Sequence, residues 1–150
     1  MRHIKIFAIL ALALSLGLIS CKKGTFGSEK DLSGTVWDSA MHKISDSASE
    51  TTWFYLEFFE GKKCTLQVDR EVRTKMSDPD EESIYVLAGT FSLNGDKLTV
   101  NLKRVEEDEE GVFSGKLPMT LKGDWSDTEL IHLVIDGVNF EFHKRPPLPL

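Results

Sequence analysis

Signatures of catalysis are missing from this sequence of 150 residues. It contains no His-Glu-x-x-His, no Cys-x-x-Cys, no Gly-x-Ser-x-Gly and no P-loop. The Gly111–Gly115 segment resembles a nucleophile elbow, but Ser114 stands at the wrong place in it. We therefore expect a protein that is not an enzyme and that uses no cofactor.

Positive charge is also scarce. Lys and Arg total 18 against 24 Asp and Glu, and the first 20 residues hold two of the cations, Arg2 and Lys5, with no acid. The remainder therefore carries 16 positive and 24 negative charges. Binding to nucleic acid depends on Lys and Arg that neutralise phosphates, so we expect no nucleic-acid partner. The hydrophobic content still suffices for one folded core.

The first 20 residues form a leader. Arg2 and Lys5 precede an apolar run over residues 6–19, and Ser20 is small, as a cleavage site requires. The run is too short for a bilayer core, which needs about 20 residues. We expect residues 1–20 to be a cleaved signal peptide.

The end of this leader, Leu18-Ile19-Ser20-Cys21, resembles the lipobox of bacterial lipoproteins. The resemblance implies that the Cys21 thiol receives a diacylglyceryl group and that the new N-terminus is acylated, for example with palmitate. Two or more acyl chains hold a protein stably at a membrane. Lys22 is not the Asp that favours retention in the inner membrane, so the resemblance favours a lipid-anchored protein of the outer membrane. An ordinary secreted protein with an incidental Cys21 is the alternative.

Residues 21–32 are polar and contain glycine, which predicts a tether. With Cys21 acylated, Cys64 has no cysteine partner. Cys64 shares strand parity with Leu66 and Val68, so we expect a buried, inert thiol.

Hydrophobic residues from position 34 onward recur with period two, which is typical of strands. Eight strands are predicted, at 34–42, 51–60, 63–75, 83–93, 96–104, 112–122, 128–135 and 138–144. Local connections and one apolar face favour closure, because a barrel removes exposed strand edges. The prediction is an all-β domain over residues 33–145, a single eight-stranded antiparallel up-and-down barrel, followed by a Pro-rich tail at 146–150.

Three turns fix the predicted registers. Asn94-Gly95 and Asp136-Gly137 are dipeptides of two-residue hairpin loops, whereas Glu60-Gly61-Lys62 keeps its flanking faces consistent only as a three-residue loop. The predicted pairs are Phe91 with Leu98, Ile135 with Val138, and Phe58 with Cys64.

Three short motifs are similar to those of lipocalin-like envelope lipoproteins. They are Leu32-Ser33-Gly34-Thr35-Val36-Trp37, Phe58-Phe59-Glu60-Gly61-Lys62 and Tyr85-Val86-Leu87-Ala88-Gly89-Thr90-Phe91. Trp37 stands one residue later than in the lipocalin pattern. The resemblance implies the fold alone, since members of this group bind different things.

Two acidic clusters, 78–82 and 106–110, are predicted to lie between strands at the same end of the barrel. Neither has the spacing of an EF-hand loop, so solvated loop tips are the expected role.

In the last hairpin His132 should face Glu141, with His143 on the same side. These three could hold a metal, but that face is predicted to point to solvent, and a surface His–Glu pair is the interpretation we favour. Three aromatic residues, Trp53, Tyr55 and Phe59, share the outer face of one strand. They could form a patch that binds a partner or a membrane, or the tether or the tail could cover them.

The inward-facing set is almost wholly apolar. It comprises Trp37, Met41, Phe54, Leu56, Phe58, Leu66, Val68, Tyr85, Leu87, Phe91, Leu98, Val100, Leu102, Phe113, Leu117, Met119, Leu121, Ile131, Leu133, Phe140 and Phe142. An eight-stranded barrel is either filled by its side chains or holds one small ligand. Gly89 and Gly115 would leave room beside Tyr85, or would mark bends. The predicted ligand site is Tyr85, Gly89, Gly115, Phe54, Phe91 and Phe113.

The function expected from these observations is an anchored, non-catalytic barrel that binds a small apolar or amphipathic ligand. The alternative is a protein–protein interaction or inhibitor module of the cell envelope that uses loops and the outer aromatic residues.

Overall fold

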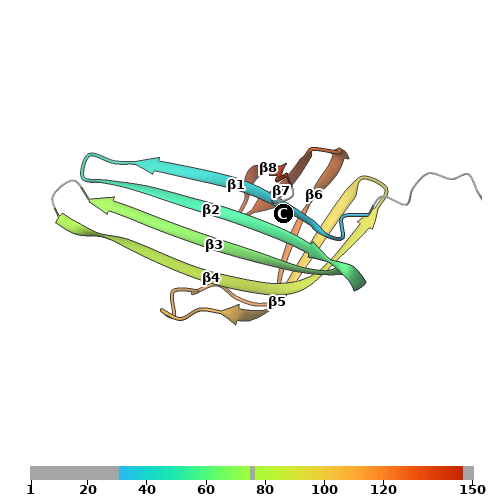
Figure 1. Ribbon diagram of the computed structural model, residues 1–150, viewed down its shortest axis with the longest axis horizontal. Helices are drawn as coiled ribbons and strands as arrows, with labels where there is room; N and C mark the ends of the chain where they lie inside the picture. The colour runs from blue at the N-terminus through green and yellow to red at the C-terminus, as the bar shows by residue number, and fades with distance from the viewer. Residues whose placement is uncertain (1–30, 75–76, 147–150) are drawn as a thin grey trace, which may run out of the picture. The chain divides into compact units, whose positions relative to one another are not determined.

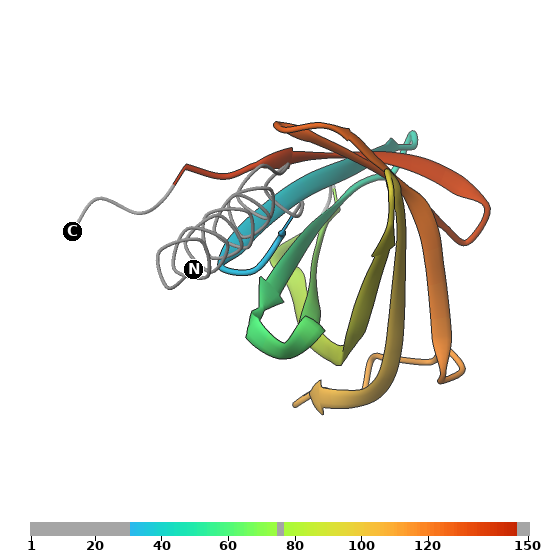
Figure 2. The same ribbon diagram turned by 90° about the vertical axis from the view of Figure 1, so that its right-hand side faces the viewer.

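The predicted eight-stranded barrel is confirmed. The computed structural model describes residues 31–74 and 77–146, and the barrel lies within the compact unit Leu32–Leu150. Each strand pairs antiparallel with its neighbours in sequence, and β1 and β8 close the barrel. Figure 2 shows the strands arranged around a common axis, with β8 in red beside β1 in blue. The strands are β1 (Thr35–Ile44), β2 (Ala48–Phe59), β3 (Lys63–Thr74), β4 (Ser77–Asn94), β5 (Lys97–Glu107), β6 (Met119–Asp127), β7 (Leu130–Ile135) and β8 (Val138–Lys144).

Within the described ranges, no helix has the length and apolar character needed to cross a membrane.

Two of the three predicted hairpin registers are confirmed. Asp136 and Gly137 have φ values of 50° and 78°, as a type I′ loop requires, and Ile135 pairs with Val138. The three-residue loop between β2 and β3 is the 3-10 turn η2 (Glu60–Lys62), and Phe58 pairs with Cys64 as predicted.

The register predicted at Asn94-Gly95 is wrong. The loop residues are Gly95 and Asp96, so Leu93 pairs with Leu98 and Phe91 with Val100. Gly95, with φ of 61°, takes the first central position, as in a type II′ loop. The two registers differ by two positions along one strand, and such a slip leaves every side chain on the same face. The apolar pattern therefore could not separate them.

The predicted strand 112–122 is also corrected. β6 begins at Met119, and residues 108–118 form an irregular loop. The carboxylate of Asp108 accepts hydrogen bonds from the backbone N–H groups of Val112 (2.8 Å) and Phe113 (3.2 Å). Such side-chain bonds to the backbone compete with strand pairing. The alternation continued into this loop because Phe113 packs against the core without joining the sheet.

The acidic segment 78–82 lies inside β4 and not in a loop, which corrects a second boundary. The 106–110 cluster ends β5 and enters the following turn. The end of β3, the start of β4 and the β5–β6 connection lie at the end of the barrel opposite Gly95, as the predicted meander requires.

Aromatic side chains fill the interior. Trp37 and Trp125 meet edge to face with ring centroids 6.4 Å apart, and Phe58 and Phe91 do so at 4.7 Å. Every member of the predicted inward set is buried in this core or packs against it. The prediction missed Trp125, and it missed Leu32, which is fully buried.

The strands have unequal lengths, and this positions the site. β4 has 18 residues and β2 has 12, whereas β7 has 6 and β8 has 7. In Figure 1, β1 to β4 extend well past the region where β6 to β8 cross. A long sheet of four strands therefore projects beyond the short β7–β8 hairpin.

Candidate functional site: a cleft between the first and last strands

The barrel closes through a short seam. β1 and β8 pair only at Trp37 with Lys144 and at Asp38 with His143. One further bond runs from the N–H of Arg145 to the carbonyl of Val36, at 2.8 Å. Beyond Asp38, residues 39–44 of β1 pair with β2 alone.

The separated strands present unpaired backbone groups to each other. In an antiparallel strand, alternate residues direct both N–H and C=O to the same side. Val36 uses that side to bond β8, so Ala40 and His42 direct their backbone groups the same way. These two residues are exposed and have no strand partner on that side within the described ranges.

The facing edge of β8 follows the same rule. The N–H of Lys144 donates to the carbonyl of Glu129, 3.2 Å away on the β7 side. Residues of the opposite parity, Asn139 and Glu141, therefore direct their backbone groups toward β1. Both are exposed. Donors and acceptors line the two edges of the gap.

A cleft of about 430 Å³ occupies this gap. Its lining residues are Ser39, Ala40 and Met41 of β1 and Val138, Asn139, Phe140, Glu141 and His143 of β8. Met41 and Phe140 have the parity of the core, whereas Glu141 and His143 have the parity of the outer surface. The cleft therefore runs through the barrel wall, and the ring of Phe140 meets that of Phe54 at 4.9 Å behind it.

The inner face of β1 to β4 changes from apolar to charged beside this cleft. Three successive rows across the strands carry Ser39, Phe54, Val68 and Tyr85, then Met41, Thr52, Arg70 and Ser83, then Lys43, Glu50, Val72 and Glu81. The first row packs on the core, whereas the third lies on the projecting sheet. A molecule along this face would meet apolar groups at one end and charges at the other.

An ion pair fixes the charged end. Arg70 donates from Nε and Nη2 to the two carboxylate oxygens of Glu50, at 3.0 and 3.2 Å. This hydrogen-bonded pairing lowers the pKa of Glu50 and raises that of Arg70. The sequence prediction missed both residues. Arg70 has inward parity inside the predicted strand 63–75, which was a signal for a charged inner face, whereas Glu50 precedes the predicted strand 51–60 and falls inside β2 only in the structure.

The predicted ligand site is only partly assembled. Tyr85 and Phe113 come together with ring centroids 5.3 Å apart, and burial, with Asp136 and Asp108 nearby, raises the pKa of Tyr85. Phe54 adjoins the cleft through Phe140, whereas Phe91 packs in the core against Phe58.

The space expected at the two glycines is absent. A Cβ on Gly89 would lie 1.8 Å from the carbonyl oxygen of Asn101, and one on Gly115 would lie 2.7 Å from the ring of Phe113. Gly89 allows close approach of two strands at a register shift. We therefore place the candidate site at the β1–β8 cleft.

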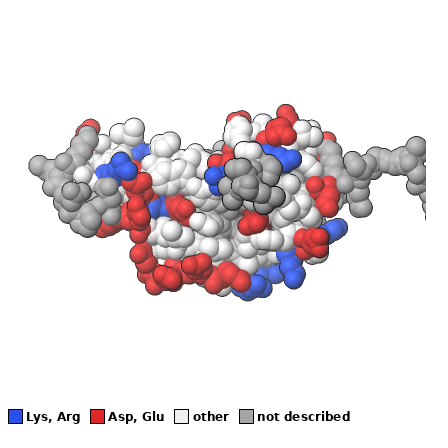
Figure 3. Space-filling view, viewed as in Figure 1, with Lys and Arg blue, Asp and Glu red and all other residues white. Residues whose placement is uncertain are grey.

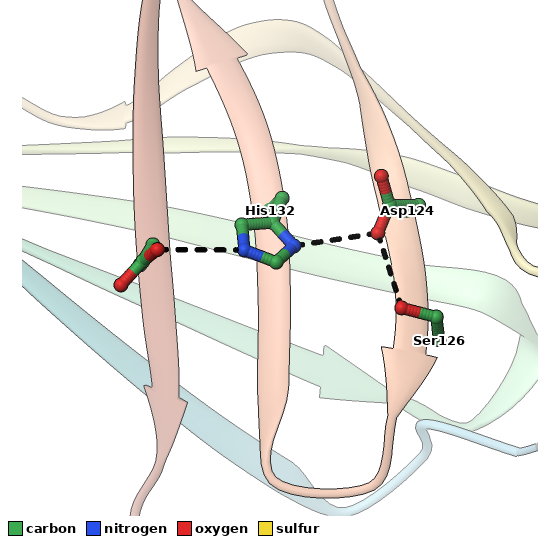
Figure 4. A network of polar contacts seen from close by, with 4 residues as sticks. Asp124, Ser126 and His132 are labelled. Atoms are coloured by element: carbon green, nitrogen blue, oxygen red, sulfur yellow. Dashed lines mark hydrogen bonds and ion pairs between the residues drawn. The ribbon is translucent and has the colours of Figure 1, made fainter.

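His132 lies in a polar network on the outer face of the last strands (Figure 4). Its Nδ1 lies 3.3 Å from Asp124 Oδ1, and its Nε2 lies 3.6 Å from Glu141 Oε1. Ser126 Oγ donates to the same Asp124 oxygen at 3.5 Å. His143 stands opposite Leu130. Over residues 31–74 and 77–146, no three His, Cys, Asp or Glu side chains form a group able to hold a metal ion.

Two other predicted residues are the cysteines. Cys64 is buried, as predicted, and burial raises the pKa of its thiol to about 12. Cys21 lies outside the described residues.

The outer aromatic residues do not form one patch. Trp53 and Tyr55 are half-buried on the outer face of β2, and the guanidinium of Arg145 lies 5.3 Å from the Tyr55 ring centroid. Phe59, which is 39% exposed, stands at the end of the strand.

The fold thus defines the chain as an all-β protein with an eight-stranded up-and-down barrel, interrupted by a lateral cleft. No protein-family model matches the sequence, and a search of curated proteins finds no significant match.

Proposed function

We propose that the protein is a lipid-anchored lipoprotein of the bacterial cell envelope, held in the outer membrane through Cys21, whose barrel binds a small amphipathic molecule without catalysis. The observation that supports ligand binding is the cleft between β1 and β8, with its apolar inner lining and its polar rim.

The size and chemistry of the cleft support this class of ligand. Its volume of about 430 Å³ falls within the roughly 300–1,000 Å³ of sites for small molecules. Met41 and Phe140 would contact an apolar chain, while the unpaired backbone groups of Ala40 and Asn139 offer hydrogen bonds to a polar group. The polar end of the ligand would extend toward Arg70.

The anchor rests on the leader and on Cys21. Substitution Cys21→Ser should abolish incorporation of a labelled fatty-acid analogue and release the protein from membranes. Unchanged labelling of the variant would exclude this anchor.

Ligand binding is tested with a dansyl-labelled C11 fatty acid added to the full-length protein. We expect saturable fluorescence enhancement, lost in Met41→Asp because a carboxylate then lies on the apolar lining. Ile44→Asp is the matched control, since Ile44 lies on the same strand, is 83% exposed and does not line the cleft.

Thermal unfolding of both variants identifies a loss that comes from misfolding. Absence of saturable binding to the unmodified protein would refute the proposed ligand class. Full binding by a folded Met41→Asp variant would refute the site.

A further inference from the structure

A second groove lies on the outer face of β2, β3 and β4. Its volume is about 270 Å³, and its lining residues are Trp53, Tyr55, Asp69, Arg70, Glu71, Glu82, Ser83 and Ile84. It belongs to the outer side of the projecting sheet, whereas the cleft lies between β1 and β8. Arg70 is the one lining residue that the groove shares with the proposed ligand binding.

On the floor of the groove, the apolar side chains of Trp53 and Ile84 flank one carboxylate, that of Asp69. Trp53, Asp69 and Ile84 stand side by side in one row across the three strands. Trp53 is half-buried, and Ile84 is 47% exposed, which is high for a large aliphatic side chain. Such a floor can accept the methylene stem of a long side chain.

Carboxylates border this floor. Thr51, Glu71 and Glu82 form the next row, so Glu71 and Glu82 are direct cross-strand neighbours. Two like charges placed opposite each other destabilise a sheet unless a cation shields them. Arg73 forms an ion pair with Glu71, whereas Glu82 has no ion-pair partner among the residues that the structure describes. Figure 3 shows acidic side chains gathered at the left and lower margins of this face.

The same face already binds one cation. The Arg145 guanidinium lies over the ring of Tyr55, at the edge of the groove. Aromatic rings attract cations through their negative faces, and nearby carboxylates add to the attraction. Arg70, the cation among the lining residues, is bonded to Glu50.

We propose that this groove binds an extended basic segment of a partner protein, with Lys or Arg side chains lying between the aromatic floor and the carboxylates. Asp69 and Glu71 lie two residues apart on β3, which places them about 6.6 Å apart along the strand. Alternate side chains of an extended peptide have the same spacing. A shallow, open groove with repeated charges fits such a segment better than an enclosed small molecule.

The probe is a fluorescein-labelled peptide of ten residues in which lysine and threonine alternate. Fluorescence anisotropy with the full-length protein should show saturable binding that weakens as salt rises. A peptide with five lysines followed by five threonines has the same charge without the alternating spacing, and we expect it to bind more weakly.

The decisive variant is Glu71→Gln with Glu82→Gln, for which we expect about tenfold weaker binding. Its matched control is Glu109→Gln with Glu110→Gln, which removes the same charge from exposed positions in the β5–β6 loop and should change binding less than twofold. Trp53→Leu should weaken binding roughly two- to fivefold, because the ring is lost while an apolar side chain stays.

Three results would overturn the inference: no saturable binding of the alternating peptide, equal affinity for both peptides, or equal losses in the two double variants. The last two would indicate diffuse attraction between opposite charges. Met41→Asp should leave peptide binding unchanged, and Glu71→Gln with Glu82→Gln should leave binding of the fatty-acid probe unchanged. Failure of the groove is therefore distinguishable from failure of the cleft.

Discussion

Substitution Gly89→Ala tests how closely β4 and β5 must approach each other. An ideal Cβ at this position would lie 1.8 Å from the carbonyl oxygen of Asn101 and 2.8 Å from the Cα of Leu102. Both obstacles are backbone atoms, so the strands themselves would have to separate by more than 1 Å to reach ordinary contact, roughly 3.4 Å or more. Overpacking typically costs about 1–3 kcal/mol, and a backbone obstacle places this site at the upper end.

We therefore expect Gly89→Ala to lower the free energy of unfolding by about 3 kcal/mol, and the melting temperature by roughly 10 °C. Urea unfolding followed by tryptophan fluorescence measures the first quantity. Gly115→Ala is the matched control. There the obstacle is the side chain of Phe113, which can move, and the entropy that Ala removes from the unfolded chain offsets the cost by about 0.4–1 kcal/mol. Equal losses in the two variants, or a stable Gly89→Ala protein, would refute the close approach.

Two further predictions concern ionisable groups. The pKa of Glu50 is lower in the folded chain than its ordinary value of 4.5, so its pairing with Arg70 stabilises fully above pH 4.5 and is lost as the pH falls through the lowered value. Because the pair is partly exposed, we expect Glu50→Gln to cost only about 0.5 kcal/mol at pH 7. The cost should be smaller at pH 2.5, as measured by urea unfolding at both pH values, and an equal loss at both would contradict the assignment. The thiolate is the reactive form of a cysteine, and burial raises the pKa of Cys64 to about 12. Peptide mapping should therefore find Cys64 unlabelled by iodoacetamide at pH 8 until urea unfolds the chain, and rapid labelling of the native protein would disprove its burial.

The sequence predicted the barrel because each local pattern agreed with it. The period-two alternation specified the inward face, and two hairpin loops specified their registers, as the pairing of Ile135 with Val138 shows. The register at Gly95 could not be predicted, because the true and predicted pairings place the same side chains inside. The start of the sixth strand was predicted wrongly, because Phe113 continues the alternation while Asp108 holds the Phe113 backbone in a loop.

The site was less accessible to sequence reasoning. Alternation identifies which residues face inward, and hence the charged inner position of Arg70, but it does not state where two strands stop pairing. That depends on how far each strand runs relative to a neighbour distant in sequence. Ser39 and Asn139 line one cleft because β8 separates from β1 after a short seam, a long-range property that local patterns do not contain.

A single asymmetry accounts for both candidate binding surfaces. β1 to β4 are long, whereas the β7–β8 hairpin ends at Gly137 after a few residues. The edge of β1 from Ser39 onward therefore loses its partner, which opens the cleft, and the sheet beyond it has solvent on both faces. Where the sheet extends beyond the core, its inner face is exposed to solvent and is no longer apolar. This explains why Glu50 and Arg70 stand there at positions that face the core elsewhere along the strands. On its outer side the same projection displays Trp53 among carboxylates. Shortening the β1–β2 and β3–β4 hairpins in register should consequently remove both binding activities while retaining the closed end of the barrel, where Trp37 and Phe58 are packed.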